Sequence, residues 1–420
     1  MNKKALLCLC CTLLPLTTVS AEQYYTDRFT VSSDLEPAYV RLVQANAEAY
    51  YANMQQRYFP TGWRKPLKIY YSKTQADTAN LLSEHGHDDS VDCGRYEPDV
   101  PAVYTHQFTN DGELNPWSSL FHQITCHFIH QSFQNPPEWF NEGLTCFFRD
   151  HARIVKADLV FAQPNPEMLQ VLKSRIDEGR RFNIKRLFSS SKEQLHAWSG
   201  GCQFAQALFY WLHQTGGLKA YLTDASQKGY DLAVLQDALS KSLTKINMEL
   251  ADFIEANCQA ADLLQQGRQA QDHTQKQQAF LDALRLKPDC LAACFELAKG
   301  YNHAGDYANC RKHLTKILDN PQSAEFLHAA RLMAATYYNQ KDYSNALEYY
   351  NRAWEYSDCY EYKYKLAYRI ANCHYHLEDT EYAKKWFQKF LDCNWEPEKT
   401  KAGNEYARKF IELTTAATSE

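Results

Sequence analysis

The chain has 420 residues, of which 45% are hydrophobic and 23% are charged, and its formal net charge at pH 7 is −5. This length exceeds that of one typical domain, so we expect two compact units, each large enough to bury a core. The ordinary globular composition excludes a largely disordered chain. The mild negative charge gives no attraction to nucleic acid, and we expect no nucleic-acid partner.

Residues 1–21 are typical of a signal peptide. They read MNKKALLCLCCTLLPLTTVSA, with a short basic start, an apolar run and small residues before a cleavage point after Ala21. The apolar run is shorter than the roughly 20 residues that span a bilayer, and no later stretch is long enough either. We therefore expect an exported protein, periplasmic or extracellular, without a membrane span.

Residues 22–257 are predicted to form an α+β domain. Apolar and β-branched residues predict strands first, and helical periodicity follows them, which is the order typical of that class. The stretch Trp198-Ser199-Gly200-Gly201 is expected to start or interrupt a helix. The predicted strands are 28–33, 66–72 and 100–106, and the predicted helices are 36–58, 117–133, 138–150, 192–214 and 245–258.

The last third of the chain contains an internal repeat. Three segments align at a period of about 36 residues, close to the roughly 34 residues of a tetratricopeptide repeat. A weaker copy, with Phe280 and Ala283 near its end, precedes them. The aligned segments are LAACFELAKGYNHAGDYANCRKHLTKIL from Leu291, LHAARLMAATYYNQKDYSNALEYYNRAW from Leu327 and YKLAYRIANCHYHLEDTEYAKKWFQKFL from Tyr364.

Small residues recur at fixed offsets within these segments. They let the two helices of one repeat approach closely, while large residues fill the space to the next repeat. Cys310 occupies such a position, so we expect it to be packed in the core rather than bound to a metal. The small positions are Ala298, Ala334 and Ala371, then Cys310, Ala346 and Ala383, with the turn pairs Gly305-Asp306, Lys341-Asp342 and Glu378-Asp379 between them.

This pattern predicts an all-α solenoid of about three or four tetratricopeptide (TPR) repeats over residues 258–397. A capping helix and tail are expected over 398–420. Exposed aromatic residues on the concave face of such a solenoid would suit protein or peptide partners.

Chemistry-bearing residues gather between residues 120 and 148, LFHQITCHFIHQSFQNPPEWFNEGLTCFF. In zinc peptidases with an HExxH motif, two histidines four apart bind the metal, and the glutamate beside the first activates a bound water. A glutamate on a following helix completes the protein ligands. His122 stands at the first histidine position, and Glu142 lies on the next predicted helix.

Residues from about 24 to 258 resemble the peptidase-MA-like domains of the gluzincin clan. The resemblance is carried by Pro137-Glu138-Trp139-Phe140-Asn141-Glu142-Gly143-Leu144, which matches the family's Pro-x-Trp-x-x-Glu-Gly-Leu segment. It implies an α+β gluzincin-like fold, a frequent association with TPR repeats, and metal ligands at positions 122, 126 and 142. Trp139 itself is expected to be a core residue.

Two positions depart from that family pattern. Gln123 stands where the general base would be, and Cys126 replaces the second histidine. A carboxamide cannot take a proton from water, and this step commonly contributes about 10²- to 10⁴-fold to the rate. We therefore expect an inactive metallopeptidase-like protein with no catalytic residue and no required cofactor. The alternative is an active zinc-dependent peptidase with the ligands His122, Cys126 and Glu142.

Cys146 lies four residues after Glu142, on the same face of the second helix. The resemblance implies that this position lies near the first histidine. Three interpretations stay open: a Cys126–Cys146 disulfide joining the two helices, a structural zinc site, or a packed remnant without metal. The zinc site would use His122, Cys126, Glu142 and Cys146.

Overall fold

The structure is a computed structural model that describes residues 22–416, apart from a number of short segments. The predicted signal peptide, residues 1–21, lies outside the described residues. Among the helices in the described part, none is both long and apolar enough to cross a membrane. The segments left out are 27, 34, 36, 61–65, 88–93, 107–116, 156, 163, 165, 321–322, 324, 358–359 and 394–399.

A five-stranded mixed sheet forms the N-terminal part, in the order β1-β2-β3-β5-β4. The three predicted strands are confirmed as β2, β3 and β5, which run parallel, and the outer strands β1 and β4 pair antiparallel to them. In β2 the buried residues alternate with partly exposed ones, as a strand with one covered face requires. The strands are β1 (Glu22–Tyr25), β2 (Phe29–Ser33), β3 (Leu67–Ser72), β4 (Arg95–Glu97) and β5 (Ala102–His106).

Two helices make the crossovers that parallel strands need. The predicted long helix is α1 (Pro37–Arg57), which joins β2 to β3 and buries Val40, Val43 and Ala47. Helix α2 (Gln75–Glu84) follows β3 and begins with a capping box, in which the Thr74 side chain accepts a hydrogen bond from the Asp77 backbone N–H. The coarse prediction of an α+β region is therefore confirmed.

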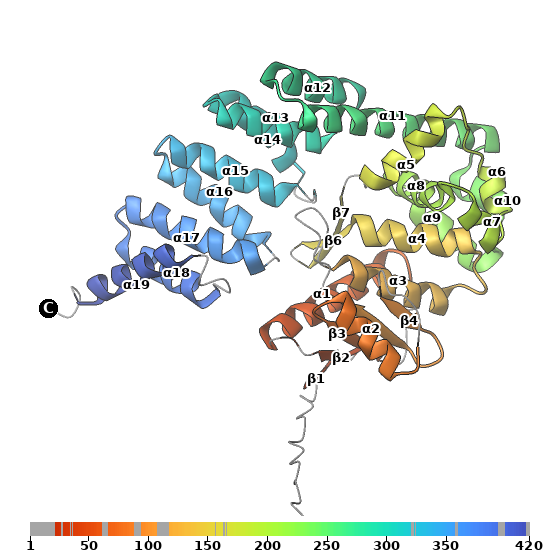
Figure 1. Ribbon diagram of the computed structural model, residues 1–420, viewed down its shortest axis with the longest axis horizontal. Helices are drawn as coiled ribbons and strands as arrows, with labels where there is room; N and C mark the ends of the chain where they lie inside the picture. Colours follow the sequence, from red (N-terminus) through yellow and green to blue (C-terminus); the bar gives the residue numbers. More distant parts are fainter. Residues whose placement is uncertain are drawn as a thin grey trace, which may run out of the picture.

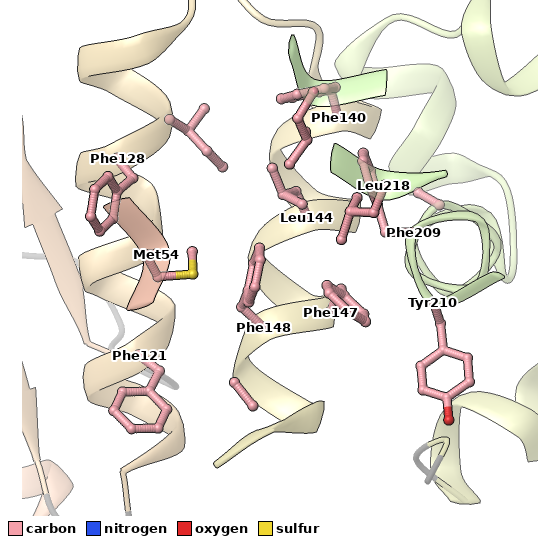
Figure 2. Packing of buried hydrophobic residues seen from close by; sticks show 14 of the residues in the cluster. Met54, Phe121, Phe128, Phe140, Leu144, Phe147, Phe148, Phe209, Tyr210 and Leu218 are labelled. Atoms are coloured by element: carbon pink, nitrogen blue, oxygen red, sulfur yellow. The ribbon is translucent and has the colours of Figure 1, made fainter. Parts of the chain in front are cut away.

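Helices α3 (Ser118–Ser132) and α4 (Glu138–His151) pack side by side next to this sheet. Figure 2 shows Phe148 and Phe147 projecting from α4 in opposite directions, toward α3 and toward α8 (Gly201–Gln214). The ring of Phe148 lies 6.4 Å from that of Tyr50, and the ring of Phe147 lies 6.2 Å from that of Tyr210. Helix α4 is therefore the centre of the N-terminal core and is held in place from both sides.

Gly143 explains how closely α4 approaches α8. A Cβ atom at this position would lie 2.9 Å from the backbone of Ala205. Any larger residue would push the two helices apart, so the Glu-Gly-Leu segment needs its glycine for packing. Trp139, one turn earlier, is fully buried and stacks on Phe188 at 4.1 Å, as expected for a core residue.

The predicted single helix at 192–214 is wrong, because the chain breaks it into α7 and α8. Gly200 has the left-handed φ of 82°, which favours glycine, and the chain turns back at Gly201 so tightly that a Cβ would lie 2.6 Å from the Leu195 carbonyl oxygen. The prediction that Trp198–Gly201 starts or interrupts a helix is confirmed. The remaining elements of this region are β6 (Ala152–Val155), β7 (Asp158–Phe161), α5 (Pro166–Asp177), α6 (Ile184–Phe188), α7 (Lys192–Ala197), α9 (Leu218–Lys228) and α10 (Leu232–Leu239).

The predicted domain boundary at 257/258 falls inside one continuous helix, α11 (Leu243–Gln269). Its first half contributes Ile246 and Ile254 to the N-terminal core, and Leu263 in its second half packs on the cluster around Phe280. Figure 1 shows α11 running from the N-terminal helices to α12. The two units therefore share this helix rather than a flexible linker.

The C-terminal part is a row of helical hairpins that follow one another in an arc (Figure 1). The expected packing of the small residues is confirmed: Ala298, Ala334, Ala371, Cys310, Ala346 and Ala383 are all fully buried. The hairpin helices are α12 (His273–Leu286), α13 (Leu291–His303), α14 (Tyr307–Leu318), α15 (Phe326–Asn339), α16 (Tyr343–Glu355), α17 (Tyr360–His376) and α18 (Thr380–Cys393), and α19 (Lys401–Ala416) packs on the end.

The turn pairs of the three aligned segments have the same conformation. The first residue of each pair has positive φ, and the aspartate that follows accepts a hydrogen bond from the backbone N–H three residues later. This geometry reverses the chain between the two helices of each hairpin. The φ values are 76° at Gly305, 61° at Lys341 and 59° at Glu378, and the bonds run from Asn309 to Asp306, Asn345 to Asp342 and Tyr382 to Asp379.

Candidate functional site

His122, the predicted first metal ligand, lies on α3 with its Nδ1 atom buried and without a hydrogen-bond partner. Burial, with a smaller contribution from the positive charge of Arg149, lowers the pKa of His122 to about 3. The imidazole is therefore neutral at physiological pH, which is the form that binds metals.

Gln123 is only 3% exposed and belongs to the buried side of α3. Two residues on, the Thr125 hydroxyl donates to the Phe121 carbonyl at 2.7 Å and lies 2.6 Å from the Tyr50 hydroxyl. His127 Nδ1 lies 2.8 Å from the Tyr96 hydroxyl. The polar groups around the HQITC stretch are thus engaged in packing the helix, and Gln123 has little access to a water molecule.

Cys126 and Cys146 are both partly buried, and they are not bridged to each other in this structure. Cys146 Sγ lies 3.9 Å from Glu142 Oε2 on its own helix, so the predicted common face of Glu142 and Cys146 is confirmed. The structure therefore does not contain the Cys126–Cys146 disulfide. The metal-binding interpretation then depends on where the other implied ligands lie.

The metal ligands implied by the family resemblance do not come together. In the described part of the chain, the one group of three or more His, Cys, Asp or Glu side chains with ligand atoms all within 4.8 Å of one another is Glu138, Glu142 and His196. His122 and Cys126 are outside this group. Neither the implied three-ligand set nor the implied four-ligand set meets this distance among the described residues.

The group that does assemble lies where α4 meets α7. Glu138 and Glu142 are one turn apart on α4, and His196 Nε2 approaches Glu138 Oε1 to 3.4 Å. Lys192 Nζ lies 3.2 Å from the same oxygen. Burial, together with the negative charge of Glu138, raises the pKa of Glu142.

Sequence reasoning missed this group. The four-residue spacing of the two glutamates was a visible signal, because such residues share one helix face. His196 carried no comparable signal, since it lies 58 residues after Glu138, on a separate helix.

A second candidate site is a cavity of about 630 Å³ between the hairpin helices. Helices α13, α15 and α17 contribute most of its wall. The described residues that line it include no Asp or Glu, in a chain whose net charge is negative. Its cations are Lys299, Arg331, Lys365 and Arg369, and its aromatic residues are Phe295, Tyr350, Tyr364, Tyr368 and Phe390.

The pKa of His328, a residue in the wall of this groove, is affected by the positive charges beside it. Burial lowers its pKa to about 4, and the charges of Arg331 and Lys299 contribute to that shift. The charge of Lys299 is partly neutralised, because its Nζ lies 2.6 Å from Glu296 Oε2. The groove therefore disfavours another cation and would favour an anionic ligand.

No family model matches this chain, and no curated protein matches it either.

Proposed function

We propose that this chain is an exported, catalytically inactive gluzincin-like protein whose TPR-like hairpins bind an acidic segment of a protein or peptide partner. The groove lined by four cations without a lining carboxylate among the described residues is the observation that carries this proposal. The absence of catalysis concerns the N-terminal unit, and the binding of an acidic segment concerns the hairpins.

Loss of catalysis is supported by the identity and burial of Gln123. A working site of this type needs a carboxylate that accepts a proton from a metal-bound water. Gln123 carries an uncharged carboxamide, and it is almost completely buried on α3. The scattered positions of His122, Cys126 and Glu142 point in the same direction, because a catalytic metal requires at least three converging protein ligands.

Binding of an acidic segment is supported by the charges and rings of the groove. Lys365 and Arg369 are exposed and one turn apart on α17, and Arg331 faces the same cavity from α15. An acidic peptide would reduce the repulsion among these cations, and aromatic side chains beside them offer apolar contact. The sign of the charge gives the specificity, so a basic or neutral peptide of the same length should bind weakly.

The test is fluorescence anisotropy with a labelled ten-residue peptide rich in Asp and Glu, and with two matched peptides in which Lys or Asn and Gln replace the acids. We expect binding of the acidic peptide only, weakened by salt. Lys365→Glu and Arg369→Glu should each lower the affinity at least about tenfold. Lys312→Glu makes the same charge change on the exposed side of α14 and should change it less than about twofold.

A readout inside the groove makes the test specific. The bound acidic peptide should raise the pKa of His328, because it offsets the charges of Arg331 and Lys299. Equal loss of binding in the groove variants and in Lys312→Glu would refute a groove site. Peptide cleavage by the unaltered chain that stops with a chelator and in His122→Ala would instead support the active zinc peptidase.

A further inference from the structure

The side chains at the junction of α4, α7 and α8 form a cluster that the proposed function does not use. Glu138 and Glu142 share one face of α4, His196 comes from the last turn of α7, and Cys202 comes from the first turn of α8. The cluster is built on three helices whose relative positions are held by the close packing at Gly143 and Gly201. Helix packing therefore fixes the backbone positions from which these potential metal ligands project.

The two carboxylates leave a surplus of negative charge in partly buried surroundings. The Glu138 side chain is 20% exposed, and Glu142 lies one helical turn further along the same helix. Like charges one helical turn apart repel each other, and burial increases the cost. A divalent cation between them would remove this repulsion.

His196 is oriented as a metal ligand. Its Nε2 atom faces Glu138 Oε1 at 3.4 Å, while Nδ1 lies 3.8 Å from Cys202 Sγ. When Nε2 binds a cation, Nδ1 carries the proton and donates it toward the sulfur of Cys202. Metal-binding histidines commonly donate a hydrogen bond from the second ring nitrogen, and this hydrogen bond fixes the orientation of the ring.

The same contacts could also suggest a cysteine nucleophile, with His196 as its base and Glu138 orienting the histidine. The electrostatics oppose that interpretation. Burial and the charges of Glu142 and Glu138 raise the pKa of the Cys202 thiol to about 11. A nucleophilic cysteine needs a lowered pKa, so these surroundings do not favour a Cys202 thiolate.

We propose that Glu138, Glu142 and His196 form a binding site for one divalent transition-metal ion, with Zn²⁺ as the probe. Two carboxylate oxygens and one imidazole nitrogen are a ligand set that zinc accepts, and the two negative charges neutralise the ion. The site is displaced from the one implied by the gluzincin resemblance, since it shares Glu142 but uses neither His122 nor Cys126. It does not depend on the proposed peptide groove.

The position of Lys192 leads to a specific prediction about the affinity for Zn²⁺. Its ammonium lies 3.2 Å from Glu138 Oε1 and is 66% exposed, so it is a competing cation that must leave when metal binds. Lys192→Ala should therefore increase the affinity for Zn²⁺ about two- to fivefold. Because Cys and His residues exposed by unfolding also bind Zn²⁺, the gain counts only for a variant that keeps its helices.

The experiment measures Zn²⁺ binding by isothermal titration calorimetry and by metal analysis after dialysis, with the full chain from Glu22 previously treated with a chelator. We expect one equivalent of Zn²⁺ per chain. Glu138→Gln and His196→Ala should weaken binding at least about tenfold. His122→Ala and Cys126→Ala are the matched controls and should leave the affinity within about twofold.

Circular dichroism of each variant verifies that its helices are intact before the titration. Absence of saturable Zn²⁺ uptake by the folded chain would overturn the proposal. So would loss of binding in His122→Ala with retention in His196→Ala, because that result would place the metal at the position implied by the family. An unchanged or lower affinity of Lys192→Ala would also count against it.

Discussion

The N-terminal unit and the hairpin array are built on different principles. In the N-terminal unit, decisive contacts join residues far apart in the chain, such as the Tyr50 and Thr125 hydroxyls or the Asn53 side chain, which accepts a hydrogen bond from the Leu159 backbone N–H. In the array, equivalent residues of neighbouring repeats make equivalent local contacts. The array can therefore vary in sequence at its exposed positions without losing its fold, whereas each site in the first unit depends on the whole domain.

This difference also separates the two candidate sites. The groove consists of side chains that project from successive hairpins, so it is a regular surface on a repeated scaffold. The Glu138, Glu142 and His196 group exists only because α7 turns back onto α4. A substitution that disturbs one helix should therefore weaken the groove only in part. The same kind of substitution in the first unit should separate Glu138, Glu142 and His196 altogether.

The largest effect is expected from removing one large buried ring in each unit. Trp139→Ala and Phe387→Ala both delete a fully buried side chain, and each should lower the free energy of unfolding by about 3–5 kcal/mol. Hydrogen exchange should show faster exchange throughout the N-terminal unit for Trp139→Ala. For Phe387→Ala it should show faster exchange mainly in α17, α18 and α19, because repeats contact only their neighbours.

Phe387→Leu serves as the control, since it keeps most of the buried volume and should cost less. Faster exchange in the first unit of Phe387→Ala would contradict a local array.

A smaller effect is expected from adding one methyl group to a helix glycine. Gly143→Ala should cost about 1–3 kcal/mol, because the new Cβ would meet the Ala205 backbone at 2.9 Å. Gly300→Ala in α13 is the matched control, where the nearest atom would be His273 Nε2 at 3.7 Å. It should be neutral or stabilise the chain by up to about 1 kcal/mol, owing to helix propensity. Urea unfolding of both variants measures the difference, and equal effects would show that α4 and α8 are less tightly packed than described.

A gradual effect that depends on pH is expected from two histidines with lowered pKa values. The pKa is about 3 for His122 and about 4 for His328, against a usual value of 6.5. As the pH falls below about 6.5, the unfolded chain takes up these protons first. Each histidine then removes up to about 1.4 kcal/mol of stability per pH unit until its folded pKa is reached. His122→Gln should therefore make the loss of stability between about pH 6 and pH 4 less steep.

Salt distinguishes the two histidines by the cause of their shifts. Burial dominates both, but His328 also faces Arg331 and Lys299 in an open groove. Raising the salt concentration from about 0.05 to about 0.5 M should raise the pKa of His328 more than that of His122. An NMR titration of the imidazole signals measures both, and a pKa of His122 near 6.5 would show that α3 is open to solvent.

The sequence predicted the buried positions of the helical hairpins correctly. For the N-terminal unit it predicted the main strands but not every element or boundary. Small residues at positions such as Ala334 and Ala346 predicted burial correctly, because helix periodicity translates directly into one packed face. The strands β2, β3 and β5 were also predicted, whereas the short β6–β7 hairpin was not. The boundary at 257/258 was placed inside α11, since the periodicity of a helix does not tell which of two cores its apolar face contacts.

Sequence alone determined the helical hairpins, the carboxamide at position 123, and the shared face of Glu142 and Cys146, because these follow from residue identity and local spacing. Tertiary structure decided that His196 lies with Glu138 and Glu142, in a group that does not include His122 or Cys126, and that the groove cations face one cavity. The physical reason is that contacts between distant segments depend on how helices pack and where the chain turns, as it does at Gly200 between α7 and α8.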